Sequence, residues 1–177
     1  RVIFCVVAIT IVGNTIFAQH IDNTTSRLDS LVNAVEVRPF NGVILVKQQG
    51  KVLYENAIGY ADYDKKVPNK MEDEFVLLSN SKQITAVLIL MATDEGLLQL
   101  ENPISRYLPN LSMPWADIIT VHQLLNHTSG LDATDKPLLF EPGTDFKYAD
   151  INYVLLGQII ESVRHQTYAD VATALFK

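Results

Sequence analysis

The sequence predicts an α+β fold, and three observations support this prediction. Two β-rich runs come first, at residues 43–47 and 52–59, and a Gln-Gln-Gly stretch lies between them. Apolar residues at helical spacing dominate the rest of the chain. Strand and helix patterns do not alternate as they would in βαβ units, and a hairpin followed by helices is typical of the α+β class.

Each element has its own local signal. Leucine and valine at helical spacing predict a helix over residues 22–36. Gly50 can supply the positive φ that a tight hairpin turn requires. Residues 60–75 are polar and are expected to form a connecting loop. A long helix is predicted over residues 79–95, and Gly96 is placed to end it. Its expected buried stripe consists of Ile84, Val87, Leu88 and Met91.

Three further helices are expected. Thr120 is placed to cap a short helix that runs to Asn126. Residues 151–163 carry apolar side chains at helical spacing. Thr167 and Asp170 have the spacing of a capping box and open the last helix.

Composition limits the classes of function. The 177 residues are 48% hydrophobic and 19% charged, as in a globular protein that can bury a core. The formal net charge is −6, and lysine and arginine do not cluster. Because nucleic-acid binding requires a basic face, we expect no nucleic-acid partner.

The N-terminal residues have the three parts of a secretory signal peptide. Arg1 precedes an apolar run at residues 2–12, and small or polar residues lead to Ala18. We expect residues 1–18 to be a cleaved signal peptide and residues 19–177 to form one domain, periplasmic or secreted, in the bacterial cell envelope. The alternative is an uncleaved membrane anchor, although the apolar run is short for a membrane span. Cleavage would remove the only cysteine and with it any cysteine metal ligand.

Ser79 and Lys82 stand at the start of the long predicted helix. Residues three apart on a helix point to neighbouring positions on one face. The helix dipole favours negative charge on the serine oxygen, and apolar surroundings would lower the pKa of the lysine until its amine acts as a base. A hydroxyl, a base and a helix N-terminus together make an activated nucleophile. The spacing alone is a weak signal, because a surface serine and a snorkelling lysine give the same pattern.

Three segments resemble, in the same order, landmarks of the penicillin-recognising serine hydrolases. The segments are FVLLSNSKQITAVL from Phe75, ITVHQLLNHTSGL from Ile119, and FEPGTDFKYADINYVLLGQIIESV from Phe140. The subfamily resembled is that of class C β-lactamases, D-alanyl-D-alanine carboxypeptidases and related esterases. The resemblance runs from about Phe40 to the end of the chain and implies a β-lactamase/transpeptidase-like fold.

The resemblance also implies a role for each site residue. Ser79 would be the acylated nucleophile, and Lys82 its proton acceptor or shuttle. The Tyr-x-Asn motif of the family falls on Tyr148, Ala149 and Asp150, so Tyr148 would be the general base that returns a proton to the leaving group. The implied substrates are D-alanyl peptides, β-lactams or small esters, with no cofactor.

Two residues depart from the family pattern. Leu78 stands where the family has a small residue, and it could alter the approach to Ser79 or pack inward. Asp150, a candidate substrate-binding residue, stands where the family has Asn. An ionised carboxylate only accepts hydrogen bonds and opposes formation of the Tyr148 phenolate. The alternative is that Asp150 is protonated or paired with Lys82.

The last family motif, Lys or His followed by a small residue and Gly, does not appear after Tyr148. The chain starts with Arg1 and ends within an expected helix. We therefore interpret it as an N-terminal fragment that lacks the C-terminal strands, with an open site and no activity on its own.

Two classes of function stay open. The first is an exported serine acyl hydrolase. The second is a non-catalytic relative that binds peptidoglycan or a peptide at the cell envelope, which Leu78 and Asp150 could signal. No metal site is expected, because His122 and His127 do not share a helix face. His127 is expected to be structural.

Overall fold

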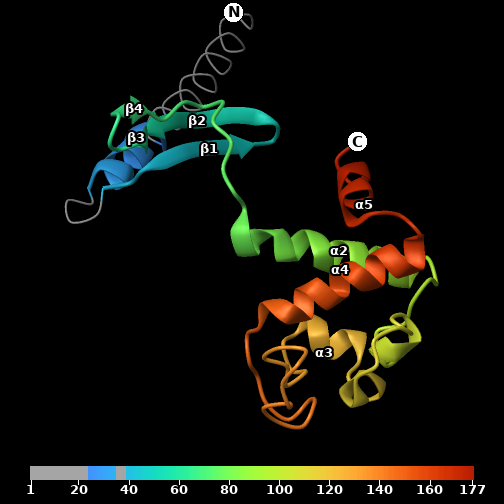
Figure 1. Ribbon diagram of the computed structural model, residues 1–177. Coiled ribbons are helices and arrows are strands. Elements are labelled where there is room, and N and C mark those ends of the chain that lie inside the picture. The colour runs from blue at the N-terminus through green and yellow to red at the C-terminus, as the bar shows by residue number, and fades with distance from the viewer. Residues whose placement is uncertain (1–23, 35–38) are drawn as a thin grey trace, which may run out of the picture. The chain divides into compact units, whose positions relative to one another are not determined.

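A computed structural model describes residues 24–34 and 39–177 of the chain (Figure 1). The chain divides into two compact units, one ending at Phe75 and one running from Val76 to Lys177. The signal peptide expected at residues 1–18 lies outside the described residues. Within the ranges described, no helix has the length and apolar character needed to cross a membrane.

The first unit contains a helix over residues 24–33 and the expected hairpin. Strands β1 (Gly42–Gln48) and β2 (Lys51–Ile58) run antiparallel. Both residues of the turn between them, Gln49 and Gly50, have positive φ. Such turns match the right-handed twist of the two strands, which explains the tight connection. The predicted hairpin is confirmed.

A second small antiparallel pair, β3 (Tyr60–Asp62) and β4 (Val67–Pro68), lies in the segment predicted as a loop. Buried Asn69 follows it, and its Nδ2 donates a hydrogen bond to the carbonyl of Ile58 over 2.7 Å. The loop prediction was wrong for these residues, because strands of 3 and 2 residues are too short to show an alternating pattern in the sequence.

The second unit is helical. Helices α2 and α4 pack against each other, and α5 contacts both (Figure 1). The α-helices are α2 (Ser81–Asp94), α3 (Val121–Leu125), α4 (Asp150–Arg164) and α5 (Tyr168–Ala174). Three short 3-10 turns are η1 (Leu78–Asn80), η2 (Ile104–Arg106) and η3 (Pro114–Asp117). Fully buried core side chains include Ile89, Ile104, Leu124, Leu156, Ile159 and Ile160.

The capping residues predicted at three helix ends are confirmed, while the long helix begins at Ser81 and not at Ser79, which lies in η1. Thr120 and Thr167 precede α3 and α5, and each side chain accepts a hydrogen bond from the N–H three residues later. After α2, Gly96 has a φ of 76° and donates to the carbonyl of Thr93, while the next N–H donates to that of Ala92. This pair of bonds is a Schellman motif, which satisfies carbonyls at the helix end.

The buried stripe of α2 differs from the expected one. Its buried residues are Thr85, Leu88, Ile89 and Ala92. The prediction was correct for Leu88, partly correct for Ile84, which is partly buried against the core, and wrong for Val87 and Met91, which are exposed. A helix whose sequence is apolar almost all round carries little information about its own rotation, so the packing partners decide which side is covered.

Candidate functional site

Ser79 lies in η1, immediately before α2. The preceding residue, Leu78, has a φ of 47°, in the left-handed region that bulky side chains rarely adopt. Leu78 is also 76% exposed, so it does not pack inward. Ser79 itself is exposed on this turn.

Ser79, Lys82 and Tyr148 lie together. The Tyr148 Oη donates a hydrogen bond to the Ser79 Oγ over 2.8 Å. The Lys82 Nζ donates to the same oxygen over 3.3 Å. The same ammonium nitrogen lies 5.0 Å from the centre of the Tyr148 ring, within the range of a cation–π contact. The loop before α4 therefore brings the phenol to the serine and lysine at the start of α2.

Asp150 also faces Lys82. The Lys82 Nζ lies 2.6 Å from the Asp150 Oδ1. Asp150 is the first residue of α4, where the helix dipole favours a carboxylate. Asp150 was expected to be a free carboxylate, a protonated carboxyl or a partner of Lys82, and in the structure it pairs with Lys82. Because the Asp150 side chain is 78% exposed, we expect the pair to contribute little to stability.

Lys82 is not a lysine with a lowered pKa. Its side chain is only 17% exposed, which disfavours the charge. Nevertheless, the hydrogen bond to Asp150, followed by that to Tyr148, raises the pKa of Lys82 above its usual value. The expectation from the sequence was wrong on this point, because a carboxylate in direct contact outweighs partial desolvation.

Tyr148 shows the opposite shift. The hydrogen bond from Lys82, followed by that to Ser79, lowers the pKa of Tyr148 below its usual value, and the charge of Asp150 opposes this. Of the phenol and the ammonium, the phenol therefore loses its proton more readily. Tyr148 is 47% exposed, so the site is open to solvent.

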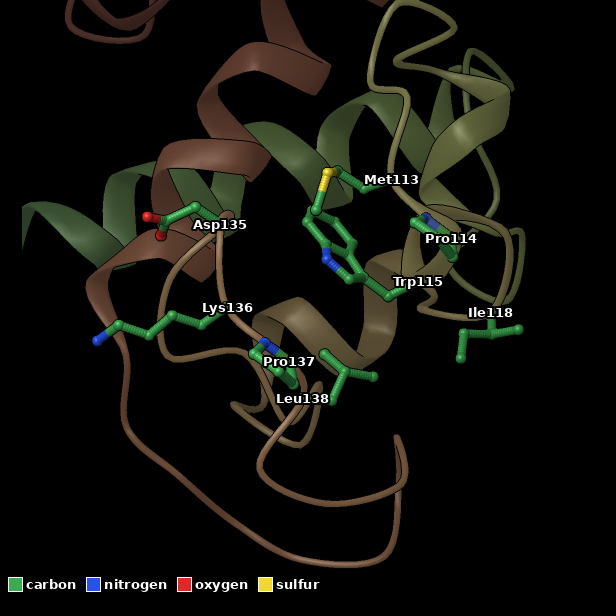
Figure 2. A pocket seen from close by; sticks show the side chains of 8 residues that line it. All are labelled: Met113, Pro114, Trp115, Ile118, Asp135, Lys136, Pro137 and Leu138. Atoms are coloured by element: carbon green, nitrogen blue, oxygen red, sulfur yellow. The ribbon is translucent and has the colours of Figure 1, made fainter.

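A cavity of about 370 Å³ adjoins Lys82 and Asp150. Its other lining residues are Ser81, Thr85, Tyr153, Val154, Gly157 and Tyr168. A larger cavity of about 490 Å³ is lined by residues 113–115, Ile118 and residues 135–138, none of them a predicted site residue. In Figure 2 the charged ends of Asp135 and Lys136 extend away from the Trp115 ring. Trp115 lines that cavity and is also part of the core.

Sequence reasoning missed Asn152, which is fully buried behind the site. Its Oδ1 accepts a hydrogen bond from the Ser129 Oγ over 2.8 Å, and its Nδ2 lies 3.1 Å from the His127 Nδ1. One signal could have found it, because Asn152 is a polar residue on the same face of α4 as buried Leu156 and Ile159. His127 is buried, in line with the structural role expected for it. No cluster of three metal-ligating side chains occurs in the described part of the chain.

Comparison with known proteins gives consistent matches. The sequence matches the beta-lactamase family over residues 34–175. It is 32% identical to Penicillin-binding protein 4* of Bacillus subtilis over 182 residues, covering 87% of this chain and 40% of that protein. The D-alanine carboxypeptidase AmpC from Burkholderia cenocepacia matches with a TM-score of 0.68 and 26% identity, covering 86% of this chain and 46% of that one. EstCE1, described as a hydrolase with promiscuous acyltransferase activity, matches with a TM-score of 0.69 and 25% identity over 92% of this chain and 51% of that one.

These matches agree with the resemblance found in the three sequence segments. The small antiparallel sheet and the helices are parts of a β-lactamase/transpeptidase-like fold. The chain spans about half or less of the length of these relatives. On its sequence and its fold, the chain belongs to the beta-lactamase family.

Proposed function

We propose that the chain carries the nucleophile of an exported serine acyl hydrolase that acts on D-alanyl peptides, β-lactams or small esters. The observation that carries the proposal is the approach of the Tyr148 phenol and the Lys82 ammonium to one oxygen, the Ser79 Oγ, at 2.8 and 3.3 Å. Two polar groups on a hydroxyl that precedes a helix are suited to nucleophilic catalysis.

The charges at the site favour Tyr148 as the base. After the phenol has lost its proton, the hydrogen bond to Ser79 reverses, and Ser79 donates to the phenolate. The Ser79 Oγ then attacks the substrate carbonyl carbon while its proton passes to Tyr148. Collapse of the tetrahedral intermediate breaks the bond from the carbonyl carbon to the amine or alcohol, which takes the proton from Tyr148. Water then attacks the Ser79 ester while its proton passes to Tyr148, and Tyr148 returns this proton to the Ser79 Oγ as the bond to the acyl group breaks and the acid leaves.

Lys82 acts electrostatically in this proposal. With Asp150 at 2.6 Å its amine stays protonated, so it stabilises the phenolate and does not itself accept the serine proton. This modifies the role implied by the resemblance, in which Lys82 accepts or shuttles the proton. A serine whose base is a phenol stabilised by an ammonium requires no metal or cofactor for acyl transfer.

The same ion pair supports a second candidate function. A lysine neutralised by Asp150 stabilises the phenolate less than a free lysine does, because the carboxylate opposes negative charge on Tyr148. A protein with this defect could retain the fold as a peptidoglycan- or peptide-binding module of the cell envelope. The two candidates differ in whether Ser79 becomes acylated.

Acylation is measured on the full-length protein with a fluorescent penicillin and with an activated ester, followed by mass spectrometry. The hydrolase predicts an adduct on Ser79 that is absent in Ser79→Ala and retained in Ser112→Ala, an exposed serine outside the site. Absence of any adduct on a folded protein would reject the hydrolase and leave the binding module.

We also propose that residues 1–18 are a signal peptide, so that the domain beginning at Gln19 works in the cell envelope. N-terminal sequencing of the protein recovered from the periplasm or medium should begin at Gln19. A mature protein that still carries residues 1–18 would contradict the proposed cleavage.

A further inference from the structure

His127 is a buried histidine for which the proposed reaction has no use. It is 8% exposed and follows α3 in the left-handed conformation, with a φ of 60°. Outside glycine, such a conformation is uncommon and persists where surrounding contacts impose it. The contacts of His127 therefore indicate which neighbouring residues this turn holds in place.

His127 contacts Tyr148 and the residues on either side of it in the sequence. The carbonyl of His127 accepts a hydrogen bond from the N–H of Lys147 over 3.0 Å. Its Nδ1 accepts from the N–H of Ala149 over 3.3 Å. Its ring lies against the Tyr148 ring, with 4.5 Å between centroids and 33° between planes. Residues 147, 148 and 149 are thus each held by the same histidine.

The other side of His127 is fixed by buried polar partners. Since the Nδ1 accepts from Ala149, it carries no proton, and the Asn152 Nδ2 at 3.1 Å is a second donor to it. Asn152 is held in turn by Ser129, whose Oγ also accepts from the N–H of Leu131 over 3.1 Å. We call His127, Ser129 and Asn152 the buried polar network. The two contacts to the Nδ1 require the neutral imidazole with its proton on Nε2.

Tyr148 depends on this support because little else holds it. About half of its surface is exposed, and its hydroxyl reaches Ser79 from outside the core. The Lys82 Nζ lies 5.0 Å from the centre of its ring, a contact that does not fix the backbone of Tyr148. The backbone on both sides of Tyr148 is fixed by His127.

We propose that His127 is a positioning residue for Tyr148, which it holds in reach of the Ser79 Oγ through the backbone of residues 147–149 and through ring stacking. The inference rests on the proposed acyl-transfer function, but it concerns the placement of the phenol and can be tested without turnover.

The test uses two variants in the full-length protein. His127→Phe retains an aromatic ring and removes the Nδ1 acceptor. His127→Asn tolerates the left-handed φ and offers an amide oxygen as acceptor. His122→Phe is the matched control, because His122 is exposed on α3 and pairs with Glu101. Circular dichroism and Tm establish that each variant is folded.

The first readout is the titration of Tyr148, followed as the ultraviolet difference between each protein and its Tyr148→Phe counterpart. We expect the Tyr148 pKa to rise toward the ordinary phenol value in His127→Phe, to return in part in His127→Asn, and to be unchanged in His122→Phe. A histidine that only stabilises the fold would lower Tm and leave this titration where it is.

The second readout is the rate of acylation by a fluorescent penicillin, with a loss of about 10- to 100-fold expected in His127→Phe, as for small misplacements of catalytic groups. A folded His127→Phe with the wild-type titration and rate overturns the inference.

If the wild-type protein is not acylated at all, the proposed function fails, and the titration alone decides whether His127 positions Tyr148. If His127→Phe does not fold, Ser129→Ala is used, which removes one support of Asn152 and should shift the titration in the same direction by less. An unshifted titration there also overturns the inference.

Discussion

The candidate site and the buried polar network behind it hold their polar groups in opposite ways. Ser79 and Tyr148 are exposed and contact each other through hydroxyl groups at the surface. Ser129 and Asn152 are fully buried, and each is hydrogen-bonded inside the protein. The groups of the candidate site can therefore exchange protons with solvent, whereas the network residues are shielded from solvent and are held by hydrogen bonds to one another.

The largest expected effect comes from removing the exposed phenol. Tyr148→Phe should lower the acylation rate by about 10²- to 10⁴-fold, the usual contribution of general acid–base catalysis, with little change in Tm. Stopped-flow measurement with a fluorescent penicillin checks this. An unchanged rate would mean that Tyr148 is not the base, and Lys82 would then be the remaining candidate at the site.

Asn152, a residue of the buried polar network, should contribute to the free energy of unfolding. Asn152→Ala leaves the Ser129 hydroxyl and the His127 Nδ1 with fewer partners in the interior and should cost about 1–3 kcal/mol in the free energy of unfolding. Urea denaturation of Asn152→Ala and of Asn110→Ala, an exposed asparagine, measures the difference. Equal unfolding midpoints for the two variants would contradict a stabilising network.

Asp150→Asn tests the exposed site alone, because it removes one surface charge and leaves the buried polar network unchanged. Without the carboxylate, the pKa of Lys82 should fall, and the pKa of Tyr148 should fall further below its usual value. The base must be deprotonated to act, so the rising limb of the acylation rate against pH should move to lower pH. Acylation at neutral pH should therefore increase. A limb that stays in place or moves to higher pH would exclude Asp150 as the cause of weakened catalysis.

The smallest expected effect is on the acid stability of the network. Burial, followed by the charge of Lys82, lowers the pKa of His127 below its usual value, while Asp150 opposes this. The unfolded state therefore binds the proton more readily than the folded state. The contribution of the neutral His127 to the free energy of unfolding is fully present above pH about 6.5, the unperturbed pKa of histidine. It is lost as the pH falls toward the lower pKa of the folded state. Urea midpoints of wild type and His127→Asn across this range should converge at acidic pH, and parallel curves would contradict the assignment.

Local signals in the sequence predicted the hairpin and the helices well. Gly50 marked the hairpin turn, and Thr120 and Thr167 marked the starts of α3 and α5. Turns and caps form between residues a few positions apart, so their signals are contained in short stretches of sequence. The strands β3 and β4 were missed, because with 3 and 2 residues they are too short to show an alternating pattern.

The residues proposed for the candidate site came from the Ser-x-x-Lys spacing and the likeness of residues 148–150 to a Tyr-x-Asn motif, and the structure brings them together. The sequence did not predict the charge interactions among them. The pKa of Lys82 is raised where the apolar helix start suggested that it would be lowered, since Asp150 lies 68 positions away in sequence and 2.6 Å away in space. Leu78 was expected to pack inward or alter the approach to Ser79, and its exposure excludes the first.

Short, regular spacings of residue types in the sequence were enough to predict the family of the chain, its hairpin and its helices, and to propose Ser79 as the nucleophile. Only the tertiary structure decided which side of α2 is buried, which charge neighbours Lys82, and what holds Tyr148. Those properties depend on contacts between residues far apart in the chain, and the Coulomb and packing energies that govern them vary over distances of a few ångströms.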